Sequence, residues 1–212
     1  MSLTNPSATF ELVYAKTLMP DVTYAAVVLL LTGAAIYAVI VYNGLVRLQN
    51  EIGRAWANID VLLKQRHDEI PNLVACVKGY MDYERQTLEA VTQARAASMN
   101  AASIPQKAQA DALLTGALRS FFVVAERYPQ LRANQNFLAL QNRISELEER
   151  IADRREFFND DVNTYNTRIA QLPDVFLARV IKLQPREMFR VNEQERQSVE
   201  VKLALARGQG TS

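Results

Sequence analysis

The strongest pattern along the chain is an apolar run from Tyr24 to Val41 (YAAVVLLLTGAAIYAVIV). Its 18 residues include no Asp, Glu, Lys or Arg. A helix rises about 1.5 Å per residue, so one helix of roughly this length crosses the ~30 Å hydrocarbon core of a bilayer. A helix also satisfies its own backbone hydrogen bonds in lipid. The run predicts a transmembrane helix over residues 24–42, which binds the lipid bilayer, after a short N-terminal tail over residues 1–23.

A buried core helix and a cleaved signal peptide both fit this run less well. A buried core helix would carry polar residues on part of its surface, whereas every face of this segment is apolar. A cleaved signal peptide would have a basic start and a small-x-small cleavage site. Only Lys16 precedes the run, and YNGLV follows it. We therefore expect an uncleaved anchor.

Beyond the span, apolar residues recur every three or four positions, which is typical of one face of an α-helix. A first stripe contains Leu45, Leu48, Ile52, Ala55, Ile59 and Leu62. A second stripe has the same period but is shifted by one residue, and contains Ile70, Val74, Val77, Met81, Leu88 and Val91. The transmembrane helix is expected to continue directly into the first stripe.

Pro71 lies at the shift between the two stripes, and two structures are compatible with it. In one, the helix continues with a kink, because Pro71 lacks the N–H that would bond the carbonyl of His67. In the other, Asp68 caps a new helix that has Pro71 in its first turn. We favour the kink, because the intervening residues are poor turn formers.

The remaining helices have clear start and stop signals. Residues Ser103-Ile-Pro-Gln106 have the form of a capping box, and the helix after them ends near Tyr128-Pro129. Asn134 can cap a last long helix that Pro173 stops. The predicted fold is therefore all-α: the transmembrane helix continues into an antiparallel up-and-down bundle of three to four long helices over residues 43–172. Residues 173–212 are expected to form a short helix or loop and a flexible C-terminal tail.

Charge and composition restrict the function further. The formal net charge is +1, which gives no broad basic field for nucleic acid. Cys76 is the only cysteine, so an intrachain disulfide is excluded. Arg47 and Arg54 follow the span, whereas Lys16 precedes it, and basic residues beside a span stay in the cytoplasm. We expect the N-terminus outside and the helical domain in the cytoplasm.

The sequence predicts no catalytic, cofactor or metal site. A di-iron carboxylate bundle needs two Glu-x-x-His motifs, but His67 is the only histidine. His67 and Cys76 cannot by themselves supply the several His and Cys ligands of a zinc site. No Gly-x-Ser-x-Gly motif, phosphate-binding loop or dinucleotide-binding fingerprint occurs. We therefore expect a protein that is not an enzyme.

Polar residues inside the apolar stripes form the candidate site. Arg154 lies between Ile151 and Phe158, and Arg66 stands where the first stripe would continue. A buried arginine is costly unless it is paired, so we expect these arginines to meet carboxylates or to lie at the surface. If Arg154 is buried, Asp60 or Asp68 should contact it, with Asp161 as a same-helix alternative. The pattern fits either an interhelical salt bridge or a partner-binding groove. The candidate residues of this interaction or buried polar cluster are Arg66, Asp68, Asn72, Arg154 and Asn159.

Several segments resemble the LemA family of bacterial proteins. They are YNGLV from Tyr42, AWANIDVLLKQRHDEIPNLVACVKGYMDYERQTLEAVTQAR (55–95), YPQLRANQNFLALQ (128–141) and FFNDDVNTYNT (157–167). The resemblance implies one N-terminal transmembrane helix, a tail outside the cell and a helical domain in the cytoplasm, but no reaction. Family members related to magnetosome biogenesis show that such a domain can serve membrane-compartment assembly, which is an analogy for this chain and not evidence of its role. Phe158 stands where the family often has tyrosine, and the residues after Phe189 follow the family pattern loosely.

These observations predict a single-pass protein of the cell inner membrane. We expect its helical bundle to act as a scaffold or adaptor for protein partners whose identity the sequence does not give. A homo-oligomer is compatible with this prediction. The alternative is a membrane-remodelling or lipid-sensing protein whose bundle binds or polymerises on the bilayer.

Overall fold

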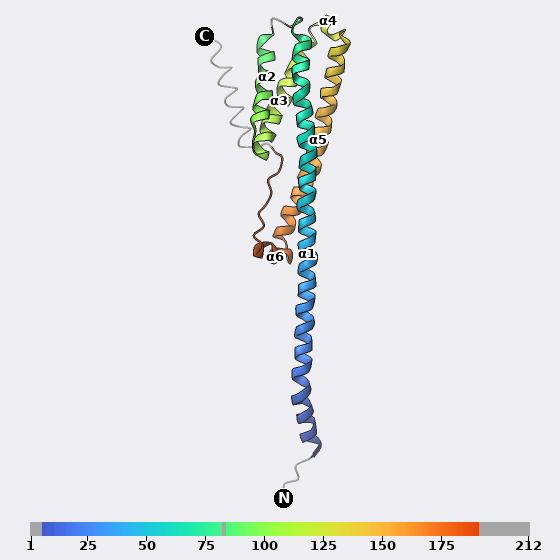
Figure 1. Ribbon diagram of the computed structural model, residues 1–212, viewed down its shortest axis with the longest axis vertical. Helices are drawn as coiled ribbons and strands as arrows, with labels where there is room; N and C mark the ends of the chain where they lie inside the picture. Colours follow the sequence, from blue (N-terminus) through green and yellow to red (C-terminus); the bar gives the residue numbers. More distant parts are fainter. Residues whose placement is uncertain (1–5, 82–83, 191–212) are drawn as a thin grey trace, which may run out of the picture.

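The computed structural model describes the backbone of residues 6–81 and 84–190, and the side chains of residues 22–81 and 84–190. All regular elements in these ranges are helices, which confirms the predicted all-α class (Figure 1). They are α1 (Pro6–Val77), α2 (Arg85–Asn100), α3 (Ile104–Ala125), α4 (Pro129–Arg132), α5 (Gln135–Ala170) and α6 (Asp174–Val180). The expected flexible tail, beyond residue 190, lies outside the described residues.

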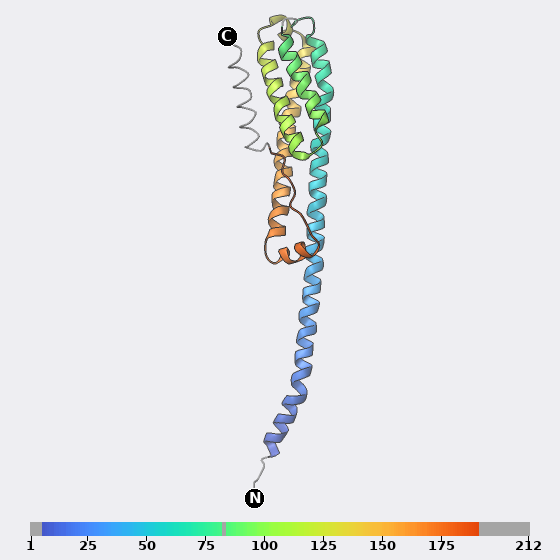
Figure 2. The ribbon, with the colours of Figure 1, turned by 90° about the vertical axis from the view of Figure 1, so that its left-hand side faces the viewer.

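Helix α1 sets the shape of the molecule. It has 72 residues and is roughly 108 Å long at ~1.5 Å per residue. The other helices lie beside its C-terminal half, and its N-terminal half projects from the bundle (Figures 1 and 2). One helix therefore forms both the predicted span and the first helix of the bundle.

The projecting part of α1 has the properties of a membrane span. Its most apolar 18-residue window has a mean hydropathy of 2.4, and only 6% of that window is buried. Side chains from Val22 to Ile40 are exposed except for half-buried Ala38, whereas Val41 and Leu45 are buried. This helix is long and apolar enough to cross a membrane, and the bundle begins where the exposed run ends.

The bundle is built from two helix pairs that follow the predicted up-and-down order. Helix α5 packs along α1, and α2 packs along α3 (Figures 1 and 2). The predicted capping box is present at α3, where the Ser103 hydroxyl accepts a hydrogen bond from the Gln106 backbone N–H. The Asn134 side chain likewise caps α5 by accepting hydrogen bonds from the backbone N–H groups of Asn136 and Phe137.

Helix α1 continues through Pro71 to Val77 without a break. The alternative in which Asp68 starts a new helix is therefore wrong. The His67 carbonyl, which Pro71 leaves without a helical partner, instead accepts a hydrogen bond of 2.8 Å from Nε of Arg95 on α2. This side-chain donor satisfies the carbonyl while the helix continues. The predicted kink at Pro71 stays a prediction.

The apolar core consists of two clusters stacked along the bundle. The cluster nearer the span includes Leu45, Ile59 and Phe158, and the far cluster includes Leu73, Phe121 and Phe137. Trp56 packs against the first cluster, with its ring centroid 5.5 Å from that of Phe158 and 5.8 Å from that of Phe189. On α1 the first cluster ends at Leu63 and the second begins at Ile70. Arg66 lies between them.

Candidate functional site

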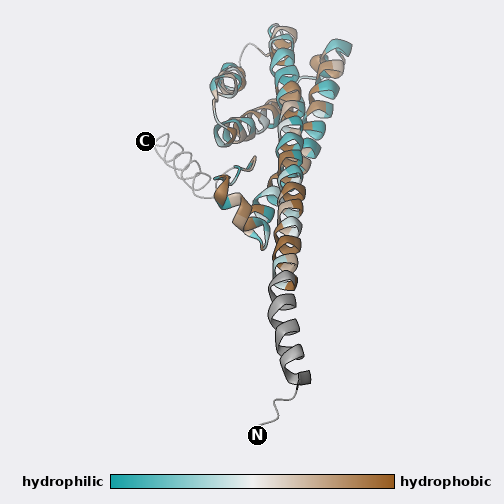
Figure 3. Ribbon diagram, turned by 60° about the horizontal axis from the view of Figure 1, so that its bottom comes forward, coloured by the Kyte–Doolittle hydropathy of each residue, from teal (hydrophilic) through white to brown (hydrophobic). Residues whose placement is uncertain are grey.

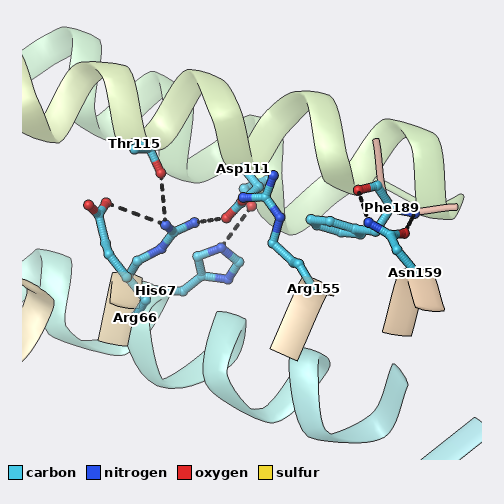
Figure 4. Close-up of polar contacts among 9 residues, drawn as sticks. Arg66, His67, Asp111, Thr115, Arg155, Asn159 and Phe189 are labelled. Atoms are coloured by element: carbon cyan, nitrogen blue, oxygen red, sulfur yellow. Dashed lines mark hydrogen bonds and ion pairs between the residues drawn. The ribbon is translucent and has the colours of Figure 1, made fainter. Parts of the chain in front are cut away.

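A layer of charged side chains separates the two apolar clusters. Arg66 of α1 is only 1% exposed and Asp111 of α3 is fully buried. One Arg66 Nη atom pairs with an Asp111 carboxylate oxygen, and the other donates a hydrogen bond of 3.2 Å to the Thr115 hydroxyl (Figure 4). The second Asp111 oxygen lies 3.0 Å from Nη1 of Arg155 on α5. Asp111 thus connects three helices.

Glu148 of α5 completes this charge layer. One of its carboxylate oxygens lies 3.5 Å from Nη1 of Arg66. Burial raises the pKa of the Glu148 carboxyl, and the positive charge of Arg66 opposes part of that rise. The layer holds two arginines and two carboxylates, so the charges balance. Such an arrangement fixes how helices pack, because removing one member leaves a buried charge without a partner.

His67 lies beside this layer. Its Nε2 atom is 2.8 Å from the hydroxyl of Ser98 on α2. Burial lowers the pKa of His67, and the charges of Arg66 and Arg95 lower it further. The lowered pKa favours the neutral imidazole, and its hydrogen bond to Ser98 joins α1 to α2. Among the described residues, no group of three or more His, Cys, Asp or Glu side chains could hold a metal ion.

The five candidate residues do not form one cluster. Arg66 belongs to the charge layer, whereas Asp68 and Asn72 are exposed on α1. The Asn159 amide binds the backbone of Phe189, accepting a hydrogen bond of 2.8 Å from its N–H and donating one of 3.3 Å to its carbonyl. Asn159 therefore holds the segment after α6 against α5 (Figure 4).

The expectation that Arg154 is buried and paired with Asp60 or Asp68 is wrong. Arg154 is exposed, and its guanidinium lies 5.8 Å from the centre of the Phe157 ring. Asp60 pairs instead with Lys107 at 2.5 Å. The helical spacing could not show which arginine is buried. Arg154 and Arg155 lie three and four residues after Ile151, and either spacing is compatible with the buried stripe from Ile151 to Phe158. Helix α5 turns the second of these arginines towards α3.

Sequence reasoning also missed Asp111, although a signal was present. Asp111 precedes Leu114 by three residues and Leu118 by seven, so it lies on the buried stripe of α3. An acidic residue on an otherwise apolar stripe is a candidate for a buried ion pair.

Residues 55–203 match the model of the LemA family. This chain belongs to the LemA family. Protein LemA of Metamycoplasma hominis is 29% identical over 163 residues, which cover 74% of this chain and 73% of that protein. Magnetosome protein MamQ of Magnetospirillum gryphiswaldense is 22% identical over 174 residues, which cover 70% of this chain and 64% of MamQ. The predicted family is confirmed, and this member of the family is a membrane-associated helical protein.

A second polar cluster of the protein lies where the bundle meets the apolar span. Asp174 of α6 accepts a hydrogen bond of 2.8 Å from the hydroxyl of Tyr37, and its other oxygen accepts one of 2.7 Å from Nε of Arg168. The guanidinium of Arg168 packs against the backbone of α1 at Gly44. A Cβ atom added to Gly44 would lie 2.8 Å from the guanidinium nitrogens. Glycine at position 44 therefore makes room for the arginine that holds α6.

Proposed function

We propose that this LemA-family protein is a membrane-anchored, non-enzymatic scaffold or adaptor for protein partners. The observation that carries this proposal is the continuity of α1 from the exposed apolar run to the far end of the bundle. From Val41 to Val77 the helix rises roughly 54 Å at ~1.5 Å per residue. A bundle held this way extends away from the membrane and displays long helix faces to other proteins.

The buried charges support the same proposal. The two arginines of the charge layer, Arg66 and Arg155, are balanced by two carboxylates, those of Asp111 and Glu148. These groups pair between helices and do not converge on an open cleft as catalytic groups would. Their pairing favours one packing of α1, α3 and α5 over alternatives. A rigid display surface requires such a fixed packing, whereas it requires no reactive group.

The exposed Arg154 and Phe157 side chains on α5 are the proposed partner contact. Phe157 is 59% exposed, and Arg154 lies over its ring. Arginine and aromatic residues are enriched in protein interfaces and often carry much of the binding energy. Asp68 and Asn72, exposed on α1, are proposed as a second polar contact.

The proposed location is the cell inner membrane, with the N-terminus outside and the bundle in the cytoplasm. Arg47 and Arg54 follow the exposed run on the bundle side and favour this orientation.

Site-specific photo-crosslinking in the full-length protein in its own membrane tests this function. A photo-reactive amino acid at Phe157 should give discrete crosslinks to another protein, and the additional change Arg154→Glu should remove them. Leu138, which is also an exposed apolar residue of α5, is the control position and should give none of these products. Equal products at both positions would contradict the proposed contact.

The alternative, a membrane-remodelling or lipid-sensing protein, predicts a different result. Purified full-length protein in vesicles should then deform or cluster them in the absence of any partner. If the vesicles keep their shape while the Phe157 crosslinks form in cells, the scaffold function is supported. Vesicle tubulation without these crosslinks would favour the alternative.

A further inference from the structure

Helix α6 lies at the base of the bundle, beside the part of α1 that emerges from it (Figures 1 and 2). It packs on both α1 and α5. Asp174, its first residue, binds the hydroxyl of Tyr37, which belongs to the exposed apolar run of α1. The position of α6 is therefore fixed relative to the span.

The exposed part of α1 indicates where the bilayer ends. Residues 22–40 rise roughly 28 Å at ~1.5 Å per residue, which is close to the ~30 Å thickness of the hydrocarbon core. Burial by the bundle begins at Val41, one turn beyond Tyr37. A contact between α6 and Tyr37 therefore brings this short helix to the boundary between lipid and water.

The two sides of α6 differ in their environment. Asp174 and Ala178, four residues apart, face the bundle and are buried. Phe176 and Val180 form a second pair four residues apart, and they are 65% and 77% exposed. Leu172, just before the helix, is 73% exposed. Figure 3, with the base of the bundle turned forward, shows α6 as a predominantly hydrophobic element.

The exposed charged residues of α6 and of the turn after it are basic. Arg179 and Lys182 are exposed, and the acidic residue of the helix, Asp174, is buried against Tyr37 and Arg168. Long basic side chains at a membrane boundary reach the headgroups while neighbouring apolar side chains enter the lipid.

We infer that α6 is a membrane-contacting helix. The exposed apolar side chains in and next to it, Leu172, Phe176 and Val180, lie in the interfacial region of the bilayer. The basic side chains in and next to it, Arg179 and Lys182, lie among the lipid headgroups. The bilayer is the occupant that fits, because the face adjoins a helix run that lipid itself surrounds. Three apolar side chains bind a membrane weakly alone, but the anchor keeps them next to it. Contact of α6 with the bilayer sets the tilt of the bundle relative to the membrane.

This inference goes beyond the proposed scaffold function. It concerns the base of the bundle and not the partner contact at Arg154 and Phe157, and it can be tested in lipid without any protein partner. Its failure would leave the scaffold proposal intact, and the reverse also holds.

The test uses full-length protein in vesicles of phosphatidylcholine and phosphatidylglycerol. Cys76 is the only cysteine, so Cys76→Ser gives a background for single-cysteine labelling. An environment-sensitive fluorophore is attached after Phe176→Cys or Val180→Cys. The matched control is Val123→Cys on α3, a residue of similar exposure (57%) on an apolar position away from the base. Circular dichroism shows whether each labelled variant keeps its helices.

We expect labels at positions 176 and 180 to show blue-shifted emission, quenching by nitroxide-labelled lipids and protection from iodide in the water. The label at position 123 should show the opposite pattern. Quenching by iodide and not by lipid at positions 176 and 180 would show that the face lies in water and would overturn the inference. Protection from both quenchers that grows with the protein-to-lipid ratio would also overturn it, because a second copy would then cover α6.

Discussion

Arg95 donates a hydrogen bond of 2.8 Å to the main-chain oxygen of His67, the carbonyl that Pro71 leaves without its helical donor. A proline inside a helix is usually disruptive, because a backbone acceptor is left unpaired. Here a side chain from the neighbouring helix α2 supplies the missing donor. The same bond fastens α2 to α1, so the proline becomes a point of contact between two helices.

This relationship predicts that Pro71 and Arg95 are energetically coupled. Arg95→Ala should lower the free energy of unfolding by about 1.5–3 kcal/mol, since it removes a hydrogen bond from a charged donor. In a Pro71→Ala background the same change should cost less, because the backbone N–H that alanine restores at this position can bond the His67 carbonyl. Pro71→Ala alone should change stability by only about 1 kcal/mol in either direction.

Denaturant unfolding of the four proteins in detergent measures this coupling as a double-mutant cycle. Arg85→Ala on the same helix is the control. Arg85 forms an exposed pair with Glu89, and its removal should change stability little because water screens such a pair. Strictly additive effects of Pro71→Ala and Arg95→Ala would contradict the coupling.

The charge layer predicts a large difference between two arginines of the bundle. Arg66→Ala leaves Asp111 buried with one arginine partner fewer, and breaking a buried pair typically costs about 3–5 kcal/mol. Arg154→Ala should cost under about 1 kcal/mol, because Arg154 is exposed. Thermal or denaturant unfolding of both variants checks this order. A destabilisation by Arg154→Ala as large as that by Arg66→Ala would show that Arg154 does support the packing.

The helices could be predicted from the sequence where the signal is the helical spacing of apolar residues or a capping residue. The stripes through Leu45 and Ile59 predicted α1, and Ser103 and Asn134 predicted the starts of α3 and α5, because each signal acts within one or two helical turns. Such local signals could not show which of Arg154 and Arg155 faces α3 and pairs with a carboxylate. It depends on the direction from which α3 approaches α5, and only tertiary packing determines that direction.

Contacts between distant segments were equally beyond reach. Tyr37 and Asp174 are 137 residues apart, and no local pattern pairs them. The sequence showed an apolar stretch after Pro173 but gave no indication that it would return to the base of the bundle beside the span.

His67 predicts a pH dependence of stability. Its folded pKa is lowered, first by burial and then by Arg66 and Arg95, with Asp111 and Asp68 opposing the shift. The unfolded chain therefore binds a proton more readily, so His67 contributes full stability above a pH of about 6.5 and loses it as the pH falls towards the folded pKa. His67→Gln should remove this part of the slope.

Melting temperatures of both proteins between about pH 5 and 7.5 test this effect, since His67 is the only histidine and its normal pKa is about 6.5. The raised pKa of Glu148 acts in the opposite direction, because stability then falls as the pH rises through its titration. Glu148 is present in both proteins, so its contribution cancels when the melting temperature of His67→Gln is subtracted from that of the wild type at each pH. A difference that does not vary with pH would contradict the lowered pKa of His67.

The proposed orientation predicts the behaviour of reporter fusions. A reporter that is active only in the periplasm, fused to the C-terminus of the full-length protein, should be inactive, whereas one active only in the cytoplasm should work. Protease added outside spheroplasts should leave the bundle intact. Digestion of the bundle would reverse the proposed orientation but not the membrane anchor, because the exposed apolar run of α1 spans lipid equally well in either direction.

The last prediction concerns how α6 is held in place. Asp174 accepts hydrogen bonds from both Tyr37 and Arg168, so Asp174→Ala removes these two polar contacts of α6 and leaves its apolar contacts in place. The Arg168 side chain that loses its partner is partly exposed, and water can solvate it. We therefore expect local loosening of α6 and not unfolding of the bundle. Hydrogen exchange should become faster across residues 174–182 and stay unchanged in α3 and in the α1 segment around Ile59. Arg179→Ala, on the exposed side of the same helix, is the matched control and should leave all of these rates unchanged in detergent. Faster exchange throughout α1 and α5 would mean that Asp174 supports the whole bundle, whereas no change in α6 would mean that its apolar contacts with α1 and α5 suffice to hold it.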